Sequence, residues 1–167
     1  MTKEQFIEMI THEQESLRRF LRGLCSGDGF RADDIAQEAL LKAYLSFERF
    51  EGRSKFSTWL FRIAFNCWYD FQKTAGKEFE WLSLEDRPPG ESQADAADYE
   101  IDRIHEYQQL YHAIGNLSLQ EQTVILLFYM EEKSVKEIEI ITGMPSGTVR
   151  SHLSRGRRHL KEYLDTL

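Results

Sequence analysis

The chain has 167 residues, 41% of them hydrophobic, and a formal net charge of −7 at pH 7. This length suits one ordinary domain or two small ones, and the apolar content is sufficient for a buried core. The two cysteines, Cys25 and Cys67, show no CxxC or Cys/His spacing, so a disulfide framework and structural zinc are not expected, and a reducing cytoplasm is the predicted compartment.

The sequence predicts no export signal and no membrane segment. Residues 1–20 are charged throughout and lack the apolar core of a signal peptide. The longest apolar run, residues 124–130, is far shorter than the roughly 20 residues that a membrane-spanning helix needs.

The negative charge is unevenly distributed along the chain. Residues 74–103 carry 3 basic and 9 acidic side chains, whereas residues 1–73 carry 11 of each and residues 104–167 carry 7 basic and 8 acidic ones. Most of the acidity therefore lies in the middle, and the flanking segments remain compatible with a nucleic-acid partner.

The N-terminal part predicts two helices. Residues 3–24 place apolar side chains at helical spacing, which assigns that face to a core. These positions are Phe6, Ile7, Ile10, Leu17, Phe20, Leu21 and Leu24. After a loop at residues 27–29, Asp33 or Asp34 is expected to cap a second helix that extends to residue 50.

One face of this second helix is polar. Asp34, Gln37, Glu38 and Lys42 fall at i, i+3, i+4 and i+8, so they share that face. By itself the stripe is typical of a solvated surface, on which Glu38 and Lys42 form an i,i+4 pair that contributes roughly 0.2–0.5 kcal/mol.

Basic and aromatic residues alternate over residues 50–73. A loop with Arg53 and Lys55 leads into a helix that Ser57 is expected to cap. Its predicted inward positions are Leu60, Ile63, Ala64, Cys67 and Phe71, and its predicted outward positions are Thr58, Arg62, Phe65, Asn66, Tyr69 and Lys73. Cations, aromatic faces and an amide are typical of single-strand binding, but aromatics at helical spacing more often belong to a core. Both interpretations remain open.

Helical periodicity is lost between residues 74 and 102. This stretch holds Pro88, Pro89, Gly76 and Gly90 and an excess of acidic residues. It predicts a flexible acidic linker between two domains, and the alternative is an ordered surface loop within one domain.

The C-terminal part predicts about four helices, of which the last two form a helix-turn-helix. After a helix from residue 101 to 117, Ser118 and Glu121 are expected to form a capping box. A second box, Ser134 with Glu137, opens the next helix, and Gly143 supplies its left-handed end. Ser146 is expected to cap the final helix.

The two faces of that final helix differ in chemistry. Val149, Leu153, Leu160 and Leu164 are predicted to face inward, and Thr148, Arg150, Ser151, Ser154, Arg155 and Arg158 are predicted to face outward. Residues 149–161 carry five Lys or Arg and no acid. Such a face suits binding in the DNA major groove. The alternative is a solvated C-terminal helix whose cations interact favourably with the negative end of the helix dipole.

No catalytic or cofactor chemistry is predicted. The histidine pairs His105 with His112 and His152 with His159 are each seven residues apart, which is unsuited to sharing a metal ion, so they are expected at the surface. The sequence contains no Gly-rich phosphate loop, nucleophile elbow or cluster of convergent carboxylates. We therefore expect a protein that is not an enzyme, with no cofactor and no metal.

Taken in order, these motifs resemble a bacterial RNA polymerase sigma factor of the extracytoplasmic-function (ECF) group, over nearly the whole chain. DDIAQEALLKAY is similar to the family's core-polymerase-binding helix, and FEGRSKFSTWLFRIAFN to its promoter-melting loop and downstream-element helix. The segment from Leu117 to Leu160 is similar to its upstream-element domain.

The resemblance implies an all-α protein of two small helical domains, residues 1–73 and 103–167, joined by the linker 74–102. Its partners would be RNA polymerase core, promoter DNA and an anti-sigma protein. Polymerase would contact Asp34, Gln37, Glu38 and Lys42. Downstream promoter DNA would contact Arg53, Lys55, Phe56, Ser57, Thr58, Arg62 and Asn66. Upstream promoter DNA would contact Ser146, Thr148, Arg150, Ser151, Ser154, Arg155, Arg157 and Arg158.

Three positions depart from the family pattern. Glu139 stands where Ala is usual, Thr142 where an apolar residue is usual, and Phe65 where a basic residue is common. Two other classes compete with a sigma factor: a stand-alone transcriptional regulator whose N-terminal helices sense or dimerise, and an interaction adaptor that no longer binds promoter DNA. A sigma factor predicts stable binding to polymerase core and weak DNA binding alone, whereas the regulator predicts the reverse.

Overall fold

A computed structural model describes the backbone of residues 1–74 and 101–166 and the side chains of residues 1–74 and 108–166. The predicted linker lies almost entirely outside these residues. The elements in the described part are α1 (Lys3–Leu24), α2 (Gly29–Ser46), a 3-10 turn η1 (Phe47–Arg49), α3 (Phe56–Thr74), α4 (Ile101–Gly115), α5 (Leu119–Ile125), a π-helical turn η2 (Leu126–Met130), α6 (Val135–Thr142) and α7 (Ser146–Asp165). The prediction of an all-α fold is confirmed.

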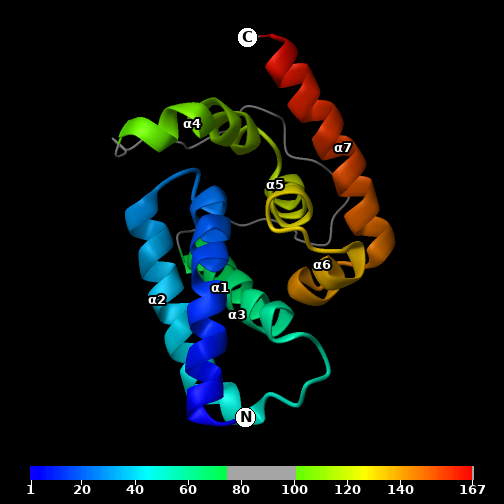
Figure 1. Ribbon diagram of the computed structural model, residues 1–167. Coiled ribbons are helices and arrows are strands. Elements are labelled where there is room, and N and C mark those ends of the chain that lie inside the picture. The colour runs from blue at the N-terminus through cyan, green and yellow to red at the C-terminus, as the bar shows by residue number, and fades with distance from the viewer. Residues whose placement is uncertain (75–100, 167) are drawn as a thin grey trace.

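Helices α1, α2 and α3 pack together as the N-terminal unit (Figure 1). Helix α1 has its predicted bounds and begins with a capping box between Thr2 and Gln5. Helix α2 begins earlier than predicted, because the carboxylate of Asp28, and not that of Asp33 or Asp34, accepts a hydrogen bond from a first-turn amide. Asp33 instead pairs with Arg18 of α1, with 2.9 Å between Nη1 and Oδ1.

Helices α4 to α7 form the C-terminal unit, in which the predicted helix-turn-helix is confirmed. The capping box of Ser134 and Glu137 opens α6, and Gly143 ends it in the left-handed region at φ 77°. Helix α7 follows after Met144 and Pro145. The cap predicted at Ser146 is wrong, because the helix includes this residue and Pro145 precedes it in an extended conformation without a side-chain cap bond.

Helix α3 differs from the predicted division into inward and outward faces. Thr58 and Phe65, predicted outward, are 1% and 3% exposed, whereas Phe71, predicted inward, is 37% exposed and lies under the guanidinium of Arg31. The reason is that α3 is covered on two sides, by α1 and α2 and by α6. The helix also begins at Phe56, so Ser57 lies inside it and is not its cap.

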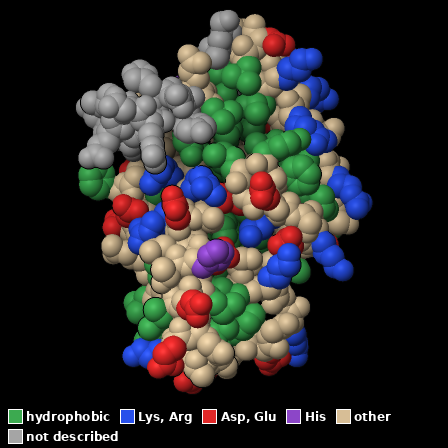
Figure 2. Space-filling model, viewed as in Figure 1, with side chains coloured by type: hydrophobic (Ala, Val, Ile, Leu, Met, Phe, Trp, Pro, Cys, Tyr) green, Lys and Arg blue, Asp and Glu red, His purple; other side chains and the backbone are tan. Residues whose placement is uncertain are grey.

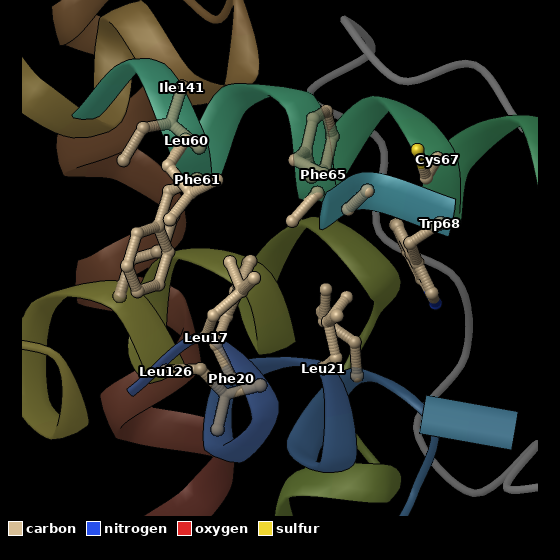
Figure 3. Packing of buried hydrophobic residues seen from close by; sticks show 14 of the residues in the cluster. Leu17, Phe20, Leu21, Leu60, Phe61, Phe65, Cys67, Trp68, Leu126 and Ile141 are labelled. Carbon is tan, nitrogen blue, oxygen red and sulfur yellow. The ribbon is translucent and has the colours of Figure 1, made fainter. Parts of the chain in front are cut away.

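The two units share one hydrophobic core. Leu17, Phe20 and Leu21 of α1, Phe61 of α3 and Leu126 of η2 all belong to this core (Figure 3). Each of these side chains is at most 1% exposed. The sequence predicted the two units but not that they would pack directly against each other.

The prediction that the histidines lie at the surface is wrong for two of them. His152 is fully buried, and His159 is half-buried with its Nδ1 2.6 Å from Oε1 of the buried Glu121. This contact joins α5 to α7, the helix that carries the basic face. Glu121 therefore serves the packing of α7 as well as the start of α5, where its backbone amide donates to the hydroxyl of Ser118.

Both cysteines are buried and neither forms a disulfide within the described residues. Burial raises the pKa of Cys67, which disfavours its reactive thiolate. Among the described helices, none combines the length and the apolar character needed to cross a bilayer.

Candidate DNA and partner interfaces

Helix α7 presents its basic face to solvent. Val149 and Leu153 are buried against the rest of the C-terminal unit, while Arg150, Ser151 and Ser154 are exposed. Figure 2 shows Lys and Arg side chains along the edge of the molecule where Figure 1 places α7. Of the remaining candidates on this helix, Arg157 and Arg158 are exposed and Ser146, Thr148 and Arg155 are partly exposed.

Close packing at Gly156 brings α7 against α5. A Cβ at this position would lie 3.0 Å from Cγ1 of Ile125 and 3.4 Å from Cβ of Glu121. The glycine therefore permits the two helices to approach, and this fixes the axis of the helix that carries the basic face.

Arg157 is oriented by a residue that the sequence did not single out. Its Nη1 donates a hydrogen bond of 2.9 Å to the hydroxyl of Tyr129, which lies in η2 and is half exposed. The only sign of this role in the sequence is the position of the tyrosine, shortly before the predicted helix-turn-helix. The hydrogen bond holds Arg157 on the flank of the basic face nearest η2.

The predicted downstream-DNA residues do not form one exposed surface. Arg53 and Lys55, in the loop before α3, are exposed, as are Arg62 and Asn66 on α3 itself. Arg53 pairs with Glu51 of the same loop, with 2.9 Å between Nη2 and Oε2.

Three other members of this set serve packing or lie partly covered. Phe56 is 5% exposed and packs against the rings of Phe6, Phe50 and Trp59, which anchors the end of the loop. Ser57 is partly buried. The hydroxyl of Thr58 donates a 3.2 Å hydrogen bond to Oε2 of Glu137 in α6.

A groove with a volume of about 740 Å³ lies beside this loop, between α1 and the start of α3. Its lining combines Glu8, Met9, Thr11, His12 and Glu13 of α1 with Lys55, Phe56 and Ser57. The two acids would repel phosphate, so a strand that placed a base in the groove would have to run its backbone on the side of Lys55.

All four predicted polymerase-binding residues are exposed on one face of α2. These are Asp34, Gln37, Glu38 and Lys42. Nζ of Lys42 lies 3.2 Å from Oε1 of Glu38, and this hydrogen bond raises the pKa of Lys42. The predicted i,i+4 pair is confirmed.

An apolar ridge accompanies this polar stripe. Leu41 and Leu45 are 58% and 72% exposed, and Tyr44 is 44% exposed. The sequence analysis identified the polar stripe on this helix but not the ridge. Leu41 and Leu45 follow Gln37 and Glu38 by one and two helical turns, so apolar and polar groups alternate along one surface as they do in protein interfaces.

The comparisons with known proteins cover both units. The sigma-70 region 2 family matches residues 9–78, and the sigma-70 region 4 family matches residues 107–160. The ECF RNA polymerase sigma factor SigW of Bacillus subtilis is 34% identical over 152 residues, covering 84% of this chain and 79% of that protein. The chain belongs to the ECF RNA polymerase sigma factors. The ECF sigma-E factor of Haemophilus influenzae is 32% identical over 155 residues, covering 80% of this sigma factor and 75% of its relative.

Solved structures agree with this assignment. The sigma factor RpoE of Bartonella quintana, in complex with the anti-sigma factor NepR, has a TM-score of 0.75 at 25% identity, covering 97% of this chain and 98% of RpoE. CnrH, in complex with the cytosolic domain of CnrY, shares the fold with a TM-score of 0.72 at 20% identity, covering 99% and 90%. The sequence-based prediction of an ECF sigma factor is therefore confirmed, and sigma factors of this family direct the initiation of transcription.

Proposed function

We propose that this sigma factor binds RNA polymerase core through the exposed face of α2 and directs it to promoters that the loop 50–55, α3 and α7 recognise. The observation that carries the core-binding part is the ridge on α2. There the exposed Leu41 and Leu45 follow Gln37 and Glu38 along the same surface, and apolar side chains of this exposure favour burial against a partner.

Downstream promoter DNA is assigned to the N-terminal unit, residues 1–73. Arg53 and Lys55 would hold phosphates, while Arg62 and Asn66 would meet bases along α3. The groove beside Lys55 would bind a base extruded from the duplex, and this binding would offset the cost of unstacking the base, which is about a few kcal/mol. Strand opening in this scheme uses binding energy and no catalytic residue.

Upstream promoter DNA is assigned to the C-terminal unit, residues 103–167, with residues 74–102 as the connection. Arg150, Ser151 and Ser154 lie in the first turns of α7, where a major-groove helix contacts base edges. Arg155, Arg157 and Arg158 lie farther along and would neutralise phosphates.

Two further assignments follow from the relatives. RpoE and CnrH were each solved with a partner, NepR and CnrY, and NepR is an anti-sigma factor. We infer that an anti-sigma protein also restrains this chain. Because bacterial RNA polymerase and promoter DNA are in the cytoplasm, the proposed function places the chain there, as a protein that is not itself an enzyme.

The test is transcription in vitro by RNA polymerase core with and without this chain, together with titration of core against labelled protein. Replacing Gln37 and Glu38 by Ala should weaken core binding by at least about fivefold, because truncating a residue that carries binding energy at the centre of an interface costs more than about 1 kcal/mol. The matched control replaces Gln14 and Glu15, an exposed Gln–Glu pair on α1, by Ala.

Equal core affinity of the α2 variant and its control would contradict the assignment of this face. Tight DNA binding by the chain alone, with no effect of core polymerase, would contradict the proposed function and favour a stand-alone regulator.

A further inference from the structure

The first turn of α2 carries a fully displayed aromatic ring. Because Asp28 caps the helix, α2 begins at Gly29 and Phe30 is its second residue. The start predicted from the sequence, with a cap at Asp33 or Asp34, lies about one turn later and leaves Phe30 outside the helix. Phe30 is 85% exposed, and no other large hydrophobic residue in the described part of the chain is more exposed.

Phe30 lies on the same face of α2 as the proposed polymerase-binding residues. Asp34 follows it by four residues, Gln37 by seven and Leu41 by eleven, which is the spacing of one helical stripe. The opposite face is buried and consists of Ala32, Ile35, Ala36, Ala39 and Ala43. With Phe30 included, the exposed stripe runs to Leu45 over about 22 Å of helix axis, with an apolar side chain at each end.

Contacts with both neighbouring helices hold this first turn in place. The guanidinium carbon of Arg31 lies 5.1 Å from the ring centroid of Phe71 on α3. The carboxylate of Asp33 pairs with Arg18 of α1 at 2.9 Å. Phe30 therefore projects from a fixed backbone, and a side chain on an ordered element loses less conformational entropy on binding than one on a frayed end.

The surroundings of Phe30 indicate what covers it. Single exposed apolar residues are common on soluble proteins, but Phe30 continues a surface for which this family has a partner, since sigma factors bind RNA polymerase. Aromatic side chains are enriched in the buried centre of protein interfaces. One turn farther on, Asp34 is exposed, and no ion pair among the described side chains includes it. The matching surface would combine an apolar depression with a nearby cation.

We propose that Phe30 is a further anchor for RNA polymerase core, which receives the ring in an apolar depression and places a basic group opposite Asp34. The inference rests on the proposed core-binding function of the α2 face and extends that face by one turn toward the start of the helix. In the free chain the ring is in water, and in the complex it is buried. Removal of this apolar surface from water stabilises the complex.

The first experiment is a titration of core polymerase against labelled full-length protein. Phe30→Ala should weaken core binding at least about fivefold, whereas Phe30→Leu, which keeps most of the apolar bulk, should retain most of the affinity. The matched control is Ile7→Ala on α1, which truncates another exposed apolar side chain, 51% exposed, and should leave core affinity unchanged. The melting temperature of Phe30→Ala should equal that of the wild type, because the side chain packs against little in the free chain.

A combined variant separates this anchor from the rest of the face. Gln37 and Glu38 lie about 10–12 Å along the axis from Phe30, and sites so far apart usually contribute independently. Replacing all three residues by Ala should therefore weaken core binding at least about 25-fold, the product of two fivefold losses. If only the Gln37 and Glu38 substitutions weaken core binding, the anchor is refuted and the proposed function stands. If none of the three does, the proposed function of the α2 face fails together with the anchor.

The second experiment identifies the molecule that covers the ring. Hydroxyl-radical footprinting, read by mass spectrometry, measures the oxidation of Phe30 in the wild-type chain alone, with core polymerase and with promoter DNA. Oxidation of Phe30 should fall when core is added and stay unchanged with DNA alone, and that of Ile7 should stay unchanged throughout. Undiminished oxidation in the complex with core would overturn the proposal. Protection that grew with the concentration of the chain itself would assign the ring to a second copy, and protection by DNA alone would assign it to the promoter; either result would also overturn it.

Discussion

The clearest test of the assignments on α7 separates Arg150 from Arg158. Both are exposed, and they are eight residues apart. At about 1.5 Å per residue the two Cα positions are about 12 Å apart along the helix axis. The major groove is about 12 Å wide, so a helix that brings Arg150 to base edges carries Arg158 to the sugar-phosphate backbone.

The two truncations should therefore have different signatures. Arg150→Ala should weaken binding to the preferred upstream element by about 1–3 kcal/mol, roughly 5- to 150-fold, and should flatten the preference among sequences. Arg158→Ala should weaken all sequences alike and reduce the slope of log K against log salt by about one.

The assay is binding and transcription by holoenzyme on a small set of upstream-element variants at two salt concentrations. Arg49→Ala, an exposed arginine in η1 of the other unit, is the control and should leave the upstream preference and the salt slope unchanged. The reasoning is refuted if Arg158→Ala changes sequence preference and Arg150→Ala does not, because α7 would then lie in the groove in another register.

Two further predictions use contacts around α6 and η2. Tyr129→Phe removes the hydroxyl that accepts the hydrogen bond from Arg157. Holoenzyme should therefore bind all upstream elements a few-fold more weakly, by about 0.5–1.5 kcal/mol, with an unchanged preference among sequences. An effect confined to some sequences would show that Tyr129 contacts bases. Burial alone would raise the pKa of Glu137, but hydrogen bonds with the backbone and side chain of Ser134 outweigh it and lower the pKa below the ordinary 4.5. A lowered carboxyl pKa stabilises the fold above that ordinary value, and the gain is lost as pH falls toward the folded-state value. The melting temperature of the wild type should therefore exceed that of Glu137→Gln at pH 7, and this difference should vanish as pH falls below about 4.5. A difference in melting temperature that did not depend on pH would mean that the charge of Glu137 is not what stabilises α6.

Local signals in the sequence determined the elements and the family. Ser134 with Glu137 satisfies amides at the start of α6, and Gly143 ends the helix in a conformation that other residues rarely adopt. These effects act within a few residues, so they can be recognised in the sequence alone. The same holds for the polar stripe of Gln37 and Glu38 on α2 and for the basic face of α7.

The tertiary structure decided which helix faces are buried and how the units meet. Periodicity predicts one inward face, but α3 packs on two sides, so Thr58 and Phe65 are buried where an outward face was expected. The ion pair between Arg19 of α1 and Glu131 joins residues 112 positions apart, and no local pattern encodes such a contact. Hydrogen bonds along a helix depend on neighbours in the chain, whereas docking of the C-terminal unit on α1 and α3 depends on shapes and charges that only folding brings together.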